Sequence, residues 1–271
     1  MKRIAFLLTA AVWLAGCGGG SDGITELSAE ENDVTTRKVL LPLYSYPNWY
    51  DGNDSYAWYP LIAAKTADSR SRITAIINPE NGHFSECNDD FARGLDDLSA
   101  AGIATIGYVY TLYGERDIAE VKEDIDNWKA CYAAKGIGGI FFDEVSTDPE
   151  RLAYYRQLSD YAREKGLSFV VLNPGTTTDS AYITSAIADI VVTYENPESR
   201  LHDDPPDSYN VPSDTTQLGL LLYETFSSVD TLDRFAREHH FTAFYYTADG
   251  EDGNPWDSID KTLPQQLRLS Y

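Results

Sequence analysis

Short apolar runs alternate with longer amphipathic segments from about residue 38 to the C-terminus. Parallel strands that are covered by helices on both faces are continuously apolar, so these runs predict buried strands. The segments between them have helical spacing; Asp148 followed by Pro149 is typical of a helix start, and Gly166 of a helix end. The predicted strands are Val39–Tyr46, Ile73–Asn78, Ala104–Tyr110, Gly139–Glu144, Ser168–Asn173, Asp189–Glu195, Gln217–Tyr223 and Thr242–Thr247. The predicted helices are Ala57–Ala67, Asp89–Ala101, Ile118–Lys135, Pro149–Lys165, Ala181–Ala188, Thr231–His239 and Asp257–Leu269.

The strand–helix alternation predicts an α/β fold, a (β/α)8 TIM barrel that forms a single domain over residues 38–271. A proline-rich stretch, His202–Pro212, interrupts the alternation before the seventh strand. A doubly wound open sheet is the alternative arrangement of the same units. Either fold brings the carboxyl ends of its strands to one region, which is where such folds carry their functional sites.

The N-terminus predicts export and a lipid anchor. Lys2 and Arg3 precede an apolar run, Ile4–Leu14, that is too short to span a membrane. The sequence Leu14-Ala15-Gly16-Cys17 resembles a bacterial lipobox, which predicts a signal peptide over residues 1–16, lipidation of Cys17 and a flexible tether over residues 17–37. The alternative is a plain secretory signal. Because Gly18 is not the aspartate that retains lipoproteins at the inner membrane, we expect an extracytoplasmic protein anchored to the outer membrane.

The net charge of −22 argues against a nucleic-acid partner, because no basic patch offsets it. Such a charge would suit a cationic substrate, for example a partly deacetylated amino-sugar polymer. The simpler interpretation, which we favour at this point, is that the acidity keeps an exported protein soluble. We expect a monomer whose only contact with a membrane is the lipid anchor.

Cys87 and Cys131 remain once Cys17 carries lipid. An even pair in an exported protein suggests a disulfide, and two free thiols are the alternative. The predicted elements place Cys87 near the rim after the second strand and Cys131 far along the third helix. A bridge would therefore require the loop around Cys87 to fold down the outer wall of the barrel.

Carboxylates follow two of the predicted strands directly. Asp143 and Glu144 end the fourth strand, Glu195 ends the sixth, and Glu224, a weaker candidate, follows the seventh. Glycosidases use two carboxyl groups, one to protonate the leaving oxygen and one to attack the anomeric carbon or activate water. The pattern therefore suggests glycosidic-bond hydrolysis with Asp143, Glu144 and Glu195 as catalytic residues. The alternative is that these acids are solvated strand ends or salt-bridge partners.

Amide and tyrosine side chains at the same strand ends are candidates for contacting sugars. Asparagine can hydrogen-bond sugar hydroxyls, and tyrosine combines a flat apolar face with a hydroxyl group. The Asn-Pro pairs are also common in turns, and some of the tyrosines must pack against the helices. The candidate substrate-binding residues are Tyr44, Asn78, Tyr108, Tyr110, Asn173, Glu224 and Tyr246.

Motifs for other chemistries are missing from the sequence. The four histidines show no metal-ligand spacing, and there is neither a Gly-x-Ser-x-Gly elbow nor a glycine-rich phosphate loop. We therefore expect no metal and no cofactor.

Four motifs together resemble the spherulin-4 family. They are Leu41-Pro-Leu-Tyr-Ser-Tyr-Pro47, Ile76-Ile-Asn-Pro79, Gly107-Tyr-Val-Tyr-Thr-Leu-Tyr-Gly-Glu-Arg116 and Gly139-Ile-Phe-Phe-Asp-Glu144. The resemblance implies a (β/α)8 glycoside hydrolase, since fungal relatives cleave α-1,4-linked N-acetylgalactosamine in the polymer galactosaminogalactan. It places the family's acids on Asp143, Glu144 and Glu195, with Asp143 as nucleophile and Glu195 as acid/base by analogy with related barrels.

One loop departs from the family pattern. Glu80-Asn-Gly-His-Phe84 stands where the resemblance implies a glycine-rich loop similar to Ser-Gly-Pro-Gly, so contacts with the substrate can differ there. The function we expect is endo-acting hydrolysis of a galactosamine-containing exopolysaccharide. The alternatives are a barrel that binds polysaccharide without cutting it and a structural envelope lipoprotein.

Overall fold

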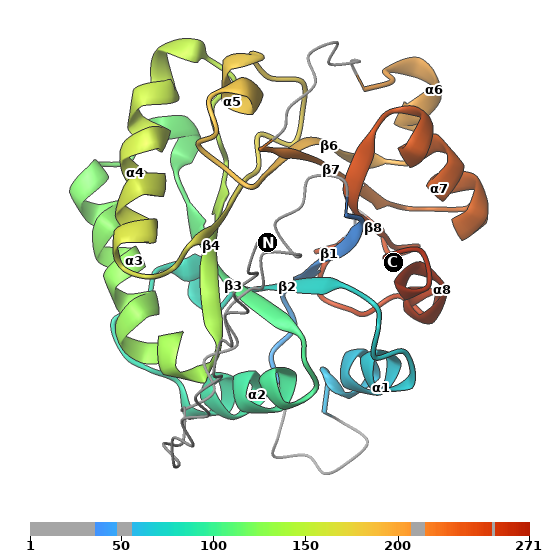
Figure 1. The fold of residues 1–271 in the computed structure, drawn as a ribbon, viewed down its shortest axis with the longest axis horizontal. Helices are drawn as coiled ribbons and strands as arrows, with labels where there is room; N and C mark the ends of the chain where they lie inside the picture. Colours follow the sequence, from blue (N-terminus) through green and yellow to red (C-terminus); the bar gives the residue numbers. More distant parts are fainter. Residues whose placement is uncertain (1–35, 48–55, 207–214, 251–252) are drawn as a thin grey trace, which may run out of the picture.

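The computed structural model describes residues 36–47, 56–206, 215–250 and 253–271. Parallel strands form a closed barrel in chain order, and β8 pairs with β1 to complete it (Figure 1). This confirms the predicted (β/α)8 fold. The strands are β1 (Lys38–Leu43), β2 (Ile73–Ile77), β3 (Ala104–Tyr110), β4 (Ile137–Asp143), β5 (Phe169–Leu172), β6 (Ile190–Pro197), β7 (Gln217–Tyr223) and β8 (Phe241–Tyr246).

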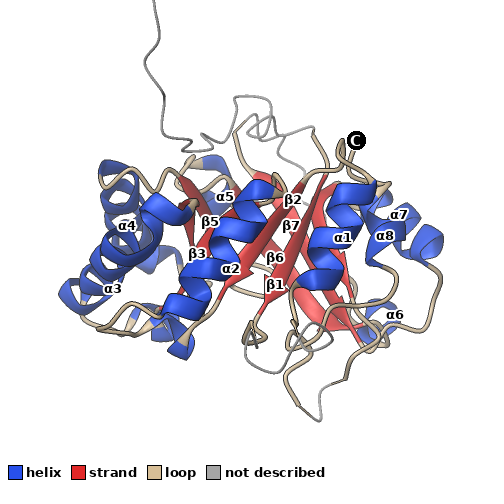
Figure 2. Cartoon of the chain, turned by 90° about the horizontal axis from the view of Figure 1, so that it is seen from below, coloured by secondary structure: helices blue, strands red, loops and turns tan. Residues whose placement is uncertain are grey.

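Helices surround the barrel on the outside (Figures 1 and 2). Asp148 begins the fourth helical segment as predicted, because its side chain accepts a hydrogen bond from the backbone N–H of Glu150; Gly166 follows the segment's end with a positive φ. The helices are α1 (Tyr59–Ala67), α2 (Asp89–Ala100), α3 (Ile118–Tyr132), α4 (Leu152–Glu164), α5 (Ala181–Thr184), α6 (Arg200–Asp203), α7 (Val229–Glu238) and α8 (Leu263–Leu267).

Two helices have no more than half of their predicted length. The closing helix was expected from Asp257, but α8 begins only at Leu263, because the carboxylate of Asp260 accepts hydrogen bonds from the backbone and hydroxyl of Thr262. Such local side-chain bonds compete with helix formation. The helix expected over residues 181–188 stops at Thr184, and Ala186 has a positive φ of 53°.

Packing between β3 and α3 fixes one wall of the barrel. Trp128 lies over Gly107, where an added Cβ would stand 2.3 Å from the indole ring. The indole N–H of Trp128 donates to the carbonyl of Tyr108 at 2.9 Å. A side chain at position 107 would therefore displace the strand that carries Tyr108.

Some predicted features lie outside the described residues. These are the signal peptide over residues 1–16, the lipidation site Cys17, nearly all of the tether over residues 17–37, and the second half of His202–Pro212. Within the described residues, no helix combines the length and apolar character that crossing a bilayer requires.

Candidate active site

Asp143 is the last residue of β4, and two side chains donate hydrogen bonds to its carboxylate. The hydroxyl of Tyr108, from β3, donates to Oδ2 at 2.7 Å, and the amide Nδ2 of Asn173 donates to Oδ1 at 2.7 Å. Asn173 directly follows β5, so each of three neighbouring strands contributes one residue. Hydrogen bonds to both oxygens fix the orientation of the carboxylate and favour its charged form.

Asn173 also links Asp143 to Glu195. The same Nδ2 donates to Oε2 of Glu195 at 2.6 Å. Since both acceptor oxygens lie within 2.7 Å of one nitrogen, they cannot be further apart than twice that distance. The structure therefore brings together two of the three predicted catalytic acids through an asparagine that was predicted to contact sugar.

Glu195 lies near the end of β6, and its second oxygen is also hydrogen-bonded. Oε1 accepts from the indole Nε1 of Trp256 at 3.0 Å. The pairing of β6 with β7 shifts register between Val192 and Tyr194, directly before Glu195. Such irregularities re-aim side chains and are common beside active sites.

Burial and mutual repulsion raise the proton affinity of this acid pair. Burial, with the charge of Asp143 as the second cause, raises the pKa of Glu195 to about 7. Burial also raises the pKa of Asp143, while the hydrogen bonds from Tyr108 and Asn173 act in the opposite direction. One proton can therefore reside on the pair near neutral pH, as the division into an acid and a nucleophile requires.

Glu144 lies beside the pair, just beyond the strand end. It has a positive φ of 51°, and its Oε2 is buried without a hydrogen-bond partner. Burial raises the pKa of Glu144, and the charge of Asp143 adds to this effect. The buried Thr111 supports this turn, because its hydroxyl oxygen lies 3.0 Å from the carbonyl oxygen of Asp143 and 2.8 Å from that of Glu144.

Tyr44 and Tyr108 form an aromatic wall next to the acids. Their rings meet edge to face, with centroids 5.6 Å apart. Burial, and after it the charge of Asp143, raises the pKa of both phenols well above the usual range. Both hydroxyls therefore remain protonated and able to donate hydrogen bonds.

Not every predicted substrate contact is placed at this centre. Tyr246 is a correction, because it is 1% exposed and its hydroxyl lies 3.5 Å from the carbonyl of Leu232 on α7, within the helix layer. Tyr110 is half-buried, and the guanidinium of Arg116 lies over its ring at 4.1 Å. Glu224 is exposed and lies against Gly250.

Sequence reasoning missed Trp256 and Thr111. Trp256 lies in the segment after β8 and contacts Glu195, which is distant in the sequence. A tryptophan beside a rim of tyrosines was a usable signal, but the strand pattern does not extend to that segment. Thr111 directly follows β3, and nothing in its local sequence marks it.

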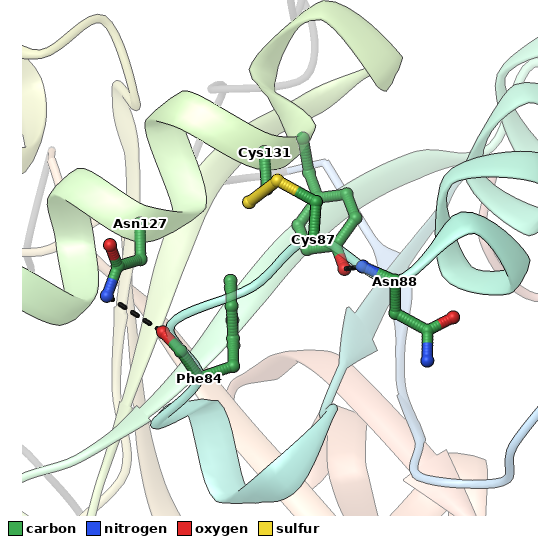
Figure 3. Close-up of a disulfide and its surroundings, with 6 residues drawn as sticks. Phe84, Cys87, Asn88, Asn127 and Cys131 are labelled. Atoms are coloured by element: carbon green, nitrogen blue, oxygen red, sulfur yellow. Dashed lines mark hydrogen bonds between the residues drawn. A yellow bond between two sulfur atoms is a disulfide. The ribbon is translucent and has the colours of Figure 1, made fainter.

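The structure joins Cys87 and Cys131 in a disulfide (Figure 3). Their Cα atoms are 5.2 Å apart. The loop before α2 lies along α3, as the bridge requires, and the side-chain amide of Asn127 donates to the carbonyl of Phe84 at 2.8 Å. Of the two alternatives that the sequence left open, the structure has the bridged one.

Comparison with known proteins identifies the family. Spherulin-4 of Physarum polycephalum is 36% identical over 166 residues, which cover 60% of this chain and 46% of that protein, so the match spans less than half of the relative's length. The crystal structure of Aspergillus clavatus Sph3 in complex with GalNAc matches 87% of this chain and 97% of its own, with 26% identity and a TM-score of 0.72. The model of Spherulation-specific family 4 matches residues 38–269, and this chain therefore belongs to that family.

Proposed function

We propose that this protein is an endo-acting glycoside hydrolase that cleaves α-1,4-linked N-acetylgalactosamine polymers with retention of configuration. Asp143 serves as the nucleophile and Glu195 as the acid/base. The observation that carries this proposal is the single amide nitrogen of Asn173, which donates to both carboxylates. Carboxyl groups about 5 to 5.5 Å apart are typical of retaining enzymes, whereas inverting enzymes separate them by about 6.5 to 9.5 Å. The bridge supports the shorter spacing.

In the first step, the Asp143 carboxylate attacks the anomeric carbon while Glu195 gives its proton to the departing glycosidic oxygen. The bond from the anomeric carbon to that oxygen breaks, and a glycosyl ester forms on Asp143. Tyr108 and Asn173 donate to Asp143 and keep it ionised in preparation for the attack. The raised pKa of Glu195, about 7, supports its role as the proton donor.

In the second step, Glu195 accepts a proton from water, and the resulting hydroxide oxygen attacks the anomeric carbon. The ester bond breaks and Asp143 leaves as a carboxylate, so both groups return to their starting states. Two displacements at the same carbon restore the original configuration. Glu144 does not enter either step; its charge helps to keep the pKa of Tyr108 high, behind burial and Asp143.

The choice of sugar rests on the relative with a bound ligand. Sph3 of Aspergillus clavatus was crystallised with GalNAc, and the match covers nearly the whole of that chain. The tyrosines beside the acids suit a sugar ring, because they combine apolar faces with hydroxyl donors. These observations support an N-acetylgalactosamine polymer as the substrate.

The test is release of oligosaccharides from a purified α-1,4-linked N-acetylgalactosamine polymer by the wild type, Asp143→Asn and Glu195→Gln. The wild type should release products, and the anomer first detected by NMR should be α. Each variant should lose at least about 100-fold in kcat, because each lacks a group that takes part in bond making or proton transfer. Far-UV circular dichroism checks that the variants are folded.

Three results would count against this proposal. Activity retained by Asp143→Asn would remove that residue from its assigned role, and β product formed first would indicate inversion. Binding of the polymer without turnover by the wild type would favour a polysaccharide-binding protein instead.

We also propose that the protein works as a monomer outside the cytoplasm, attached to the outer membrane through lipid on Cys17. The support is the lipobox-like Leu14-Ala15-Gly16-Cys17 after a short apolar run. Metabolic labelling with radioactive palmitate should mark the wild type but not Cys17→Ala. A Cys17→Ala protein that still carries label, or that still sediments with membranes, would contradict the anchor.

A further inference from the structure

A small crevice opens beside the catalytic acids, between the ends of β1 and β2 and the start of α2. Its volume is about 150 Å³, and its lining includes Tyr44, Tyr46, Asn78, Glu80, Glu86 and Phe91. Pockets for drug-sized ligands measure about 300 Å³ or more. The crevice, which we name the Glu80 crevice, is therefore suited to one sugar ring with its substituents.

Two carboxylates and one amide oxygen in this lining are free to bind a ligand. Glu80 and Glu86 are exposed, and their carboxylates form no hydrogen bond or ion pair with any part of the chain that the structure describes. The Oδ1 of Asn78 is buried and has no hydrogen-bond partner. A buried acceptor without a partner calls for an explanation, and a donor on a bound ligand would supply one.

Asp90, which lies next to the crevice on α2, is already paired. Asp90 accepts a hydrogen bond from the hydroxyl of Tyr46 and lies 3.9 Å from Arg93. The N-terminus of α2 would ordinarily favour anions. Here Asn88 caps it by accepting from two backbone N–H groups, and the first turn carries Asp89 and Asp90. The crevice therefore presents negative charge.

The loop that carries both glutamates is held rigidly. Glu80, Asn81 and Gly82 all have positive φ, and a Cβ on Gly82 would stand 1.9 Å from the carbonyl oxygen of Tyr108. Downstream, Phe84 packs against Trp128 with ring centroids 5.0 Å apart, and the disulfide at Cys87 ties the loop to α3 (Figure 3). A site held in place before the ligand arrives loses less entropy on binding.

Tyr44 connects the crevice with the catalytic centre. Its ring lines the crevice and meets Tyr108, whose hydroxyl binds Asp143. A sugar in the crevice would therefore neighbour the sugar at the acids.

We propose that the Glu80 crevice is a subsite for a sugar that carries a free, protonated amine. It directs the enzyme towards partly deacetylated galactosamine polymers. This inference rests on the proposed function, because it assigns a preference to that same site. The ammonium group would lie between Glu80 and Glu86, the Asn78 oxygen would accept from an amine or a hydroxyl, and Tyr46 and Phe91 would contact the ring.

The test compares kcat/KM on a fully acetylated α-1,4-galactosamine polymer and on the same polymer after partial deacetylation. The ratio of deacetylated to acetylated kcat/KM should exceed one for the wild type and fall about fivefold in the double variant Glu80→Gln/Glu86→Gln, since an ammonium–carboxylate pair near the surface contributes modestly. Glu123→Gln is the matched control, because Glu123 is exposed on α3 and outside the crevice lining. It should leave the ratio unchanged.

A binding measurement separates failure of this inference from failure of the proposed function. The measurement is isothermal titration of Asp143→Asn with partly deacetylated oligosaccharides. Binding should be about fivefold weaker when Glu80→Gln and Glu86→Gln are added to that variant. If the wild type cleaves neither polymer but this loss of affinity is observed, the subsite stands and the hydrolase proposal fails. If both polymers are cleaved and the ratio of deacetylated to acetylated kcat/KM is the same for the wild type and the double variant, the subsite is overturned and the hydrolase proposal stands.

Discussion

The catalytic centre and the Glu80 crevice both use carboxylates, but they hold them in opposite ways. Asp143 and Glu195 are partly buried, and hydrogen-bond donors occupy both oxygens of each. Glu80 and Glu86 are exposed and, within the described chain, unpaired. Burial raises the pKa of an acid so that it can carry a proton, whereas exposure favours the charge that attracts a cation. In the two roles that we propose, the surroundings thus decide whether a carboxylate transfers a proton and bonds to carbon or binds a cation.

The two regions also differ in what keeps them in place. The centre lies on neighbouring barrel strands, and Asn173 joins residues of β4 and β6 directly. The crevice lies on a loop whose disulfide spans 44 residues of sequence. Removing one support at a time should therefore affect the two regions separately.

The largest effect is expected from removing the disulfide with Cys87→Ser/Cys131→Ser. A loop of this length predicts a loss of about 3 to 4 kcal/mol in the free energy of unfolding, because the unfolded chain gains freedom. Urea unfolding measures it. The preference for deacetylated polymer should fall, while cleavage of acetylated polymer by the folded fraction should persist. Equal loss on both polymers would show that the loop also supports the centre.

Asn173→Ala should lower kcat about 100-fold, because it removes the donor that positions both acids. The donor also lowers the pKa of Asp143 and Glu195, so its removal raises both values. The acidic limb of the pH–rate profile, which requires ionised Asp143, should move to higher pH. The matched variant is Asn78→Ala at the other Asn-Pro turn, where the side chain contacts neither acid; it should leave the limb in place. An unmoved limb in Asn173→Ala would contradict the bridging role.

Glu195 should make the free energy of unfolding depend on pH. Its folded pKa of about 7 exceeds the ordinary 4.5, so the native state binds this proton more tightly than the unfolded state does. The contribution is complete below about pH 4.5 and is lost as pH rises through 7. The free energy of unfolding of Glu195→Gln minus that of the wild type should therefore be larger at pH 8 than at pH 4.5. The expected increase is on the order of 2 kcal/mol.

Thermal unfolding of both proteins at pH 4.5 and pH 8 measures this difference. Glu86→Gln is the control, since an exposed substitution should change the free energy of unfolding by less than about 0.5 kcal/mol. If the free energies of unfolding of Glu195→Gln and the wild type differ by the same amount at both pH values, burial does not raise the pKa of Glu195.

The sequence predicts the barrel well because each strand is a local signal. The β3 and β7 strands begin and end where the apolar runs do. The carboxylates at the end of β4 and near the end of β6 follow from the same pattern. Which tyrosines face the site is harder to predict, because neighbouring tyrosines on one strand point to opposite sides of the barrel wall. Tyr246 is at the end of β8, yet it lies in the helix layer, since only alternate positions face inward.

Contacts between distant segments could not be predicted. That Asn173 bridges two acids depends on the closure of three strands, and that Trp256 reaches Glu195 depends on a loop after the last strand. The disulfide required a loop path down the outer wall that no local pattern encodes. No local pattern predicts the crevice; the sequence indicates only that the loop beginning at Glu80 departs from the motif that the resemblance implies.

Trp256→Phe should have the smallest effect, a loss of about tenfold in kcat/KM. It removes one hydrogen-bond donor to Glu195 but keeps an aromatic ring at that position. The indole N–H lowers the pKa of Glu195, so its loss should raise that pKa. A general acid must be protonated, and the alkaline limb of the pH–rate profile should therefore shift to higher pH. Tyr223→Phe is the control, because Tyr223 meets the Trp256 ring edge to face and keeps its own ring in the variant. If the alkaline limb stays in place in Trp256→Phe, Glu195 is not the acid whose proton that limb reports.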